Sequence, residues 1–158
     1  MISIYTDGAS RGNPGPGGYG VVMIAGALRK EISEGFRLTT NNRMELLSVI
    51  VALEALKKEG TAVTVYSDSK YVVDSVEKKW VFGWEKKYFK DKKNEDLWKR
   101  FLRVYRKHAV KFVWVKGHAS NRENNRCDEL AVAAAMGGGL KIDHGYEEEQ
   151  KKERTKPV

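Results

Sequence analysis

Five stretches of the chain have the pattern of hydrophobic and polar positions that is typical of β-strands. The first alternates between the two classes, and the third also reads as a strand, although most of its residues are polar. A turn at Gly26 separates the second stretch from the third. The expected strands cover residues 2–7, 18–26, 28–38, 63–68 and 110–117.

Elsewhere apolar residues recur every three or four positions, as they do along one face of a helix. The expected helices cover residues 39–60, 69–108 with a break near 91–94, and 123–136. For the first of them, Asn41 or Asn42 is the expected N-cap and Gly60 the expected end. Three consecutive strands followed by strands alternating with helices indicate an α/β fold. We expect a five-stranded mixed sheet, three antiparallel strands and then parallel ones, flanked by helices.

The glycine-rich sequence at residues 15–20 matches the dinucleotide-binding spacing G-x-G-x-x-G. That loop must lead into a helix, whereas the apolar, largely β-branched residues 21–24 predict a strand. We therefore interpret these glycines as the turn of a hairpin beside the first strand. Without side chains they would let a nucleic-acid backbone approach, with Asn13 offering an amide.

The C-terminal stretch differs from the rest in composition. More than half of residues 140–158 are charged, so we expect most of this stretch to be disordered. The 158 residues suffice for one domain with its own core. We place that domain at residues 1–146 and a charged, flexible tail at 147–158.

The charge of the chain is concentrated in one region. The net charge is +8, and residues 78–108 alone hold twelve Lys or Arg against four Asp or Glu, together with eight aromatic residues. Basic side chains attract phosphates, and aromatic rings can pack on sugars or bases. For the lysine-rich segment, residues 78–93, we favour contact with nucleic acid. For Trp98, Phe101 and Tyr105, at helical spacing, we favour a place in the core.

Two tryptophans of the lysine-rich segment, Trp80 and Trp84, would lie one helical turn apart, so one can be core while the other reaches out. The single cysteine, Cys127, allows no internal disulfide. We see neither a secretory signal nor an apolar run of the roughly 18 residues a membrane helix needs. These features favour an intracellular, cytoplasmic protein with no membrane partner.

Four acidic residues occupy positions that solvation explains poorly. Asp7 and Asp68 each stand at the C-terminal end of an expected strand, where ligands gather in open α/β sheets. Glu45 lies in the first turns of an otherwise apolar helix, and Asp128 borders the apolar face of the last helix. Neighbouring carboxylates repel one another, and a divalent cation removes that repulsion.

Each acid also has an ordinary structural explanation. Asp7 could start a turn, Asp68 could cap the next helix, and Glu45 could pair with Arg43. Together with the basic region, they favour a two-metal phosphoryl-transfer site, with Mg²⁺ or Mn²⁺ ions about 3.5–4 Å apart. His118, in a loop before the last helix, can move protons there.

Four blocks along residues 2–146 resemble type-1 ribonuclease H in its bacterial form: YTDGASRGNPGPGGYG, TTNNRMELLSVIVALEALK, YSDSKYV and WVKGHASNRENNRCDELA. The resemblance implies that the first and fourth strands are parallel neighbours. It implies an endonuclease that hydrolyses the RNA strand of RNA/DNA hybrids with little sequence specificity, leaving 5′-phosphate and 3′-hydroxyl ends. It also implies metal binding by Asp7, Glu45, Asp68 and Asp128, with two ions once substrate is bound, and assistance by His118.

The resemblance also implies contacts to the hybrid. Residues 80–93 correspond to the family's basic protrusion, which includes Trp80, Lys86 and Lys87. Other expected contacts are Asn13, Asn41, Asn42 and Lys70, with a phosphate pocket formed by Thr40, Trp84 and Asn94. The chain departs from the family's bacterial pattern with Lys70 in place of glutamine, Leu38 in place of arginine, and Glu85 inside the protrusion.

Three other functions are weighed against this one. A non-catalytic hybrid-binding module would keep the basic region and lose acids, yet all four acids are present. Another nuclease or strand transferase with this sheet usually carries extra DNA-binding segments, for which the chain has little room. A purely structural basic protein would need none of the four acids. A monomer is the expected oligomeric state.

Overall fold

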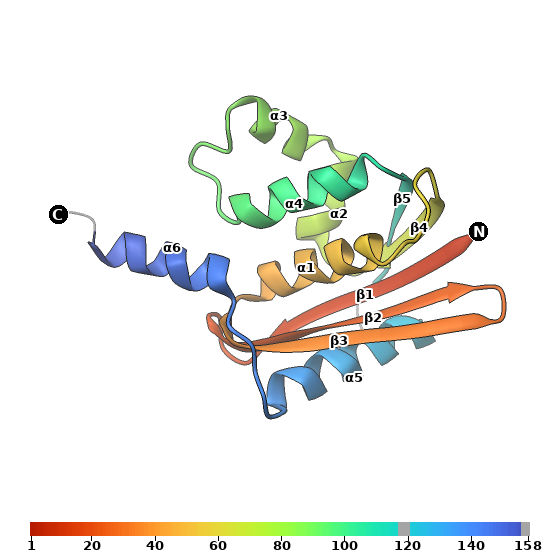
Figure 1. The fold of residues 1–158 in the computed structure, drawn as a ribbon, viewed down its shortest axis with the longest axis horizontal. Helices are drawn as coiled ribbons and strands as arrows, with labels where there is room; N and C mark the ends of the chain where they lie inside the picture. Colours follow the sequence, from red (N-terminus) through yellow and green to blue (C-terminus); the bar gives the residue numbers. More distant parts are fainter. Residues whose placement is uncertain (117–120, 156–158) are drawn as a thin grey trace.

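The computed structural model describes residues 1–116 and 121–155 (Figure 1). Its centre is a five-stranded sheet with the strand order β3-β2-β1-β4-β5. The strands are β1 (Ile2–Ser10), β2 (Gly15–Ala25), β3 (Leu28–Thr39), β4 (Ala62–Ser67) and β5 (Ala109–Trp114). The first three pair antiparallel, whereas β4 pairs parallel with β1 and β5 parallel with β4. The mixed sheet expected from the sequence is confirmed.

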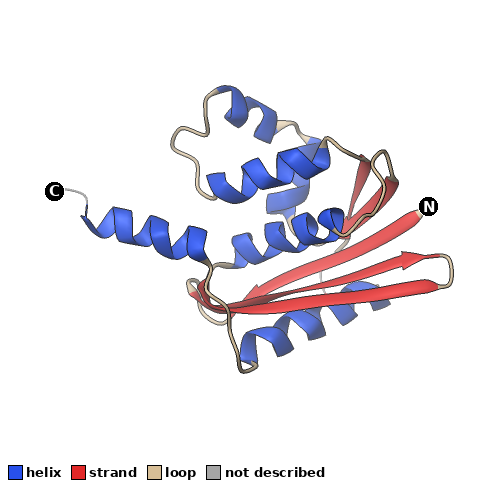
Figure 2. Cartoon of the chain, in the orientation of Figure 1, coloured by secondary structure: helices blue, strands red, loops and turns tan. Residues whose placement is uncertain are grey.

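Helices cover both faces of this sheet (Figures 1 and 2). On one face, α1 lies along β1 and β2 and packs against α4, while α5 crosses β1, β2 and β3 on the opposite face. The described helices are α1 (Asn41–Glu54), α2 (Lys70–Glu77), α3 (Trp80–Lys86), α4 (Glu95–Tyr105), α5 (Arg122–Met136) and α6 (His144–Thr155). Within the described residues, no helix is long and apolar enough to cross a membrane.

The main core lies between the sheet, α1 and α4. Ile4 and Val65 from neighbouring parallel strands are fully buried, as is Ile50 of α1. Trp98 and Phe101 of α4 are also fully buried and stack edge to face, with ring centroids 5.5 Å apart. Their predicted place in the core is confirmed, and Tyr105 packs on its border.

The glycines expected in a hairpin turn lie instead within β2, and the turn is formed by residues 11–14. A Cβ atom on Gly20 would collide with the carbonyl oxygen of Cys127 in α5, and one on Gly18 would collide with that of Ala131. The prediction of a turn was therefore wrong. These glycines allow the backbone of α5 to lie directly on the sheet.

The caps of α1 also differ from the prediction. Thr40, not Asn41 or Asn42, is the N-cap, because its hydroxyl accepts a hydrogen bond from the backbone N–H of Arg43 at 3.2 Å. The helix ends at Glu54, and Gly60 lies in the following loop, in the left-handed region with φ of 74°.

The prediction of a disordered C-terminal stretch was wrong for residues 144–155, which form α6. Two contacts attach this helix and the segment before it to β3. Lys141 exchanges backbone hydrogen bonds with Gly35 and Arg37, and Glu147 accepts two hydrogen bonds from the Arg37 guanidinium. The prediction used only the charge of this stretch. Its ordered structure depends on contacts with residues of β3, which lie more than 100 positions away in the sequence. The domain boundary at residue 146 stays a prediction.

Candidate metal site and nucleic-acid interface

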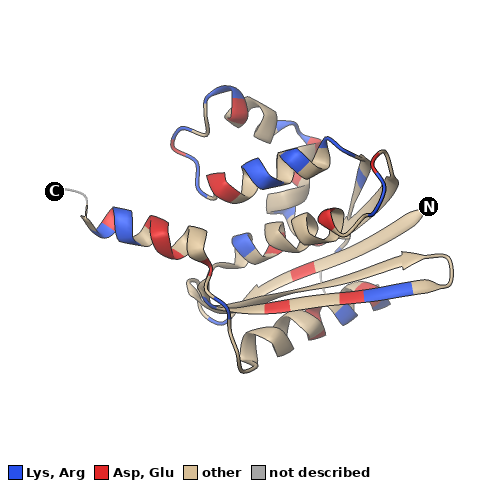
Figure 3. Ribbon diagram, in the orientation of Figure 1, with Lys and Arg blue, Asp and Glu red and all other residues tan. Residues whose placement is uncertain are grey.

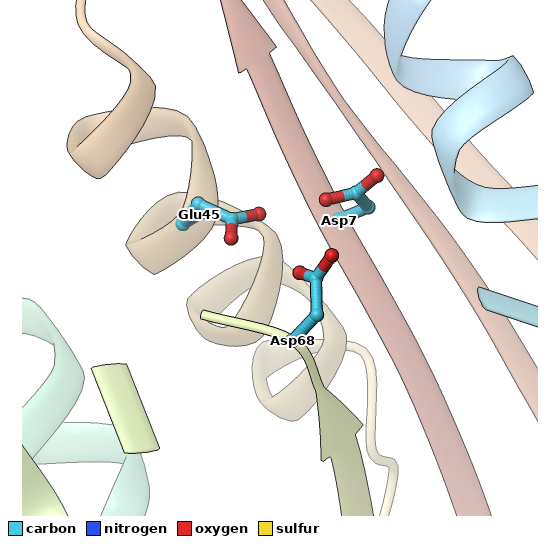
Figure 4. Close-up of side chains that lie close together, drawn as sticks. All are labelled: Asp7, Glu45 and Asp68. Atoms are coloured by element: carbon cyan, nitrogen blue, oxygen red, sulfur yellow. The ribbon is translucent and has the colours of Figure 1, made fainter. Parts of the chain in front are cut away.

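Three carboxylates converge where β1 and β4 diverge (Figure 4). Thr6 of β1 pairs with Ser67 of β4, so the next residues, Asp7 and Asp68, lie beside each other. Glu45 reaches them from the first turns of α1. One ligand atom from each of the three side chains lies within 4.8 Å of the others.

The backbone at Gly8 brings α1 close enough for this convergence. A Cβ atom at Gly8 would collide with the backbone N of Glu45, so the first turns of α1 can touch β1 only because this residue is glycine. The backbone N–H of Gly8 donates hydrogen bonds to the carboxylates of both Asp7 and Glu45. This shared donor fixes the two side chains relative to each other.

The three carboxylates carry a strong electrostatic penalty. Burial, followed by the charges of Asp68 and Asp128, raises the pKa of Asp7 from its ordinary 3.8 to about 7. Burial and the charges of Asp7 and Asp68 likewise raise the pKa of Glu45 well above its ordinary value. Among the described residues, no Lys or Arg forms an ion pair with any of these acids. The site therefore concentrates negative charge that the described protein does not neutralise.

The fourth predicted ligand, Asp128, lies at the edge of this group. It is half-buried on α5, and its contact with Asp7 contributes to the raised pKa of that residue. Asp128 does not belong to the group whose atoms lie within 4.8 Å of one another. The predicted proton carrier His118 lies outside the described residues.

A side chain that no sequence pattern had indicated holds the ends of the two strands. The amide nitrogen of Asn124, one turn before Asp128 on α5, lies 3.4 Å from the carbonyl oxygens of both Thr6 and Tyr66. Thr6 directly precedes Asp7, and Tyr66 lies two residues before Asp68. Asn124 therefore ties α5 to both strands beside the carboxylates.

The donor set fits divalent cations. Hard carboxylate oxygens are the ligands that Mg²⁺ and Mn²⁺ prefer, and cations would offset the repulsion among these buried acids. The acids line an open cleft together with Asn41, Asn42 and Lys70. A phosphodiester of a nucleic acid has access to the carboxylates through this cleft.

Two of the ordinary explanations do not hold, the cap considered for Asp68 and the ion pair considered for Glu45. Ser69, not Asp68, caps α2, since its hydroxyl accepts from the N–H of Val72 at 3.3 Å. Arg43 does not pair with Glu45. Its guanidinium instead binds Asp96 and Asp143 at 2.7 to 2.9 Å.

The predicted hybrid contacts fall into two groups. Near the carboxylates, Asn13 accepts a hydrogen bond from the N–H of Asn41 at 3.1 Å, which joins the loop after β1 to the start of α1. Farther out, Asn94 accepts from Arg43 at 3.3 Å and donates to the hydroxyl of Tyr71 at 3.0 Å. Arg43 follows Thr40 by three residues, so the structure links two predicted members of the phosphate pocket.

Trp84, the third member of that pocket, is half-buried and contacts Trp98 edge to face, whereas Trp80 is 48% exposed. The prediction that one of the two tryptophans is packed and the other reaches out is confirmed. Lys92 and Lys78 lie over their rings, at 4.9 and 5.3 Å from the centroids. In both pairs the ammonium is attracted to the face of the indole ring.

The lysine-rich segment forms α3 and the loop that leads to α4, where Figure 3 shows Lys and Arg gathered. Lys86 and Lys87 are both exposed there. Glu85, the acid inside the segment, accepts two hydrogen bonds from the guanidinium of Arg106. This pairing neutralises Glu85 and leaves the lysine charge of the segment dominant. Arg37 is committed to Glu147, so it does not replace the arginine missing at Leu38.

Comparison with known proteins agrees with the fold. The protein-family model for RNase H matches residues 1–136. The ribonuclease H of Syntrophus aciditrophicus is 53% identical over 151 residues, covering 92% of this chain and 87% of its own. The chain therefore belongs to the ribonuclease H family and is a ribonuclease.

Two solved structures are similar as well. LC9-RNase H1, described as a type 1 RNase H with the type 2 active-site motif, has a TM-score of 0.77 at 36% identity, covering 93% of this chain and 79% of its own. LC11-RNase H1, solved in complex with an RNA/DNA hybrid, has a TM-score of 0.63 at 29% identity, covering 85% and 96%. The type-1 resemblance found in the sequence is confirmed.

Proposed function

We propose that this ribonuclease hydrolyses the RNA strand of RNA/DNA hybrids within the strand, with little sequence specificity, leaving 5′-phosphate and 3′-hydroxyl ends. The observation that carries the proposal is the convergence of Asp7, Glu45 and Asp68, with no counter-ion among the described residues, in a cleft open to a phosphodiester. A hybrid-bound relative of the same fold supports the substrate class. We further propose that the protein acts as a monomer in the cytoplasm.

In this proposal Asp7, Glu45, Asp68 and Asp128 hold two Mg²⁺ ions, or Mn²⁺ in their place. Such ions supply a nucleophilic water and Lewis-acid stabilisation of the attacking and leaving oxygens. The carboxylates fix where the phosphodiester must lie, and Gly8 holds two of them in register. Asn13, Asn41 and Asn42 lie where they can orient the strands, and His118 carries a proton to or from the reacting groups.

The lysine-rich segment, including Trp80, Lys86 and Lys87, would grip the DNA strand. Thr40, Trp84 and Asn94 would hold one of its phosphates, and Lys70 would contact the hybrid beside the metal site. Because these contacts go to backbone and groove shape, they carry little sequence information. The 2′-hydroxyl groups would identify the RNA strand.

The test uses an end-labelled RNA/DNA hybrid, with single-stranded RNA and duplex RNA as controls. Each is incubated with the protein in Mg²⁺ or Mn²⁺, with and without EDTA. We expect cleavage of the RNA only in the hybrid, and none in EDTA. Asp7→Asn should bind the hybrid but not cleave it.

The matched control is Asp74→Asn, which changes the same chemical group on α2, where the aspartate makes only a 3.7 Å ion pair with Lys78. It should cleave like the wild type. Salt-sensitive hybrid binding without cleavage in either metal would instead support a non-catalytic binding module.

A further inference from the structure

At the carboxylate cleft, Lys70 contacts Trp114, a residue to which neither the fold nor the proposed function assigns a role. Lys70 is the first residue of α2 and Trp114 the last of β5. The Lys70 ammonium lies 5.0 Å from the centroid of the Trp114 ring. The pair joins the start of α2 to the end of β5, beside the acids.

The backbone of Asp68, one of the three clustered acids, also holds the Trp114 side chain in place. Its indole Nε1–H donates a hydrogen bond to the carbonyl oxygen of Asp68 at 3.2 Å. In the parallel register Trp114 lies opposite Ser67, so the pairing of β4 and β5 determines the position of Trp114 beside Asp68. The side chain is nevertheless 44% exposed. An anchored but half-exposed indole presents a fixed surface to whatever enters the cleft.

Lys70 is the only cationic residue among those that line the described cleft, which also holds Asp7, Glu45 and Asp68. A lysine two residues from Asp68 would be expected to neutralise one of these acids. Within residues 1–116 and 121–155 it forms no ion pair, and its ammonium lies over the indole instead. Attraction between the ammonium and the ring face favours this position. The carboxylates thus stay available to cations, and the ammonium stays available to an anion.

We propose that Trp114 is a positioning residue that holds Lys70 at the mouth of the cleft, where the ammonium binds a phosphate of the RNA strand next to the one being cleaved. This inference rests on the proposed function. A lysine acts on phosphate as a flexible point charge, so the contact is indifferent to base sequence and sensitive to salt. Trp114 limits where that charge can go.

The experiment measures kcat and KM for the hybrid over a range of salt concentrations, and binding of a labelled hybrid in EDTA. Lys70→Gln keeps a polar side chain without the charge. It should raise KM roughly fivefold and change kcat less than twofold. The slope of log affinity against log salt concentration should fall by about 1. Lys58→Gln, an exposed lysine after α1, is the matched control and should change neither quantity.

Trp114→Leu removes the ring face and Trp114→Phe keeps one. Trp114→Leu should raise KM roughly threefold, with Trp114→Phe between it and the wild type. In the Lys70→Gln background Trp114→Leu should have little further effect on KM, because the two residues act as one unit. A purely structural role would instead lower the melting temperature and leave the salt slope unchanged.

Two results would overturn the inference. One is a Lys70→Gln variant with the KM and salt slope of the wild type. The other is a Trp114→Leu effect that persists in full without Lys70, which would mean that the indole acts through Asp68 alone. Failure of the proposed function is distinguishable, since the wild type would then bind the hybrid in EDTA without cleaving it in Mg²⁺ or Mn²⁺. The effect of Lys70→Gln on binding would still be measurable.

Discussion

Two clusters of buried charge each include a residue from the first turns of α1, Arg43 in one and Glu45 in the other. The two clusters are built in opposite ways. At one, Arg43 is 3% exposed and binds Asp96 and Asp143 through four hydrogen bonds, so positive and negative charge meet. At the other, Glu45 lies with Asp7 and Asp68, three acids that no described cation pairs with.

The pKa values record this difference. The guanidinium of Arg43 holds the pKa of Asp96 below its ordinary value, although burial acts in the other direction. At the carboxylate cluster burial and like charge act together, and the pKa of Asp7 rises to about 7. A balanced cluster needs no external ion to compensate its charges, whereas an unbalanced one lowers stability until cations bind. The contrast separates a structural cluster from a functional one.

Asp7→Asn should break the unbalanced cluster with the largest effect. Loss of a metal ligand removes several kcal/mol of transition-state stabilisation, so cleavage should fall about 1,000-fold or more. The free energy of unfolding in EDTA should stay equal or rise, because one buried negative charge is gone. Single-turnover cleavage and urea denaturation measure the two quantities. If Asp7→Asn lost cleavage and also had a lower free energy of unfolding in EDTA than the wild type, this explanation would be contradicted.

Arg43→Met should break the balanced cluster. It leaves Asp143, which is 7% exposed, without its guanidinium partner. We expect the free energy of unfolding to fall by about 3–5 kcal/mol, measured by urea denaturation. The matched control is Arg100→Met, which breaks an ion pair with Glu54 whose partners are both 39% exposed, and it should cost less than about 1 kcal/mol. If the two variants lost the same free energy of unfolding, the buried cluster around Arg43 would be no more important for stability than an exposed ion pair.

The pH dependence of stability sharpens the comparison further. Because the pKa of Asp7 is raised from 3.8 to about 7, the folded state holds a proton that the unfolded state releases. This contribution to stability is complete below pH about 4 and is lost as pH rises to about 7. Asp96, with its lowered pKa, acts in the opposite sense, but only at more acidic pH.

In EDTA the wild type should therefore lose stability between pH 5 and pH 8, and Asp7→Asn should lose less. At pH 8, Mg²⁺ at 100 times its dissociation constant should restore about 2.7 kcal/mol to the wild type. Thermal denaturation in matched buffers measures both effects. If the stability of Asp7→Asn depended on pH in the same way as that of the wild type, the raised pKa of Asp7 would be contradicted.

The sequence was sufficient for the parts of the site that depend on local pattern. Asp7 and Asp68 each follow an apolar stretch of a strand, and parallel pairing of the two strands brings them together, although β1 itself continues to Ser10. Asn124 and Trp114 were not predictable, because their roles depend on carbonyl groups of other strands.

The balanced cluster was equally hidden from the sequence. Arg43 and Asp143 are separated by 100 positions, and composition assigned Asp143 to a disordered stretch. The prediction of the N-cap of α1 was wrong for a local reason, since Thr40, Asn41 and Asn42 are adjacent residues of types that all favour that position. Local pattern thus identified which residues carry chemistry, while the supporting contacts required the fold.

The smallest effect is expected where charge is exposed rather than buried. Replacing Lys86 and Lys87 together by alanine removes two solvated charges, so stability should not change measurably. Hybrid binding should weaken, with KM rising roughly tenfold, kcat changing less than twofold, and the salt slope falling by about 2. The matched control replaces Lys57 and Lys58, two exposed lysines after α1, and should leave the slope unchanged. If kcat fell more than KM rose, these lysines would be acting on the chemical step, and the lysine-rich segment would have to be assigned to the cleft instead of to the grip on the DNA strand.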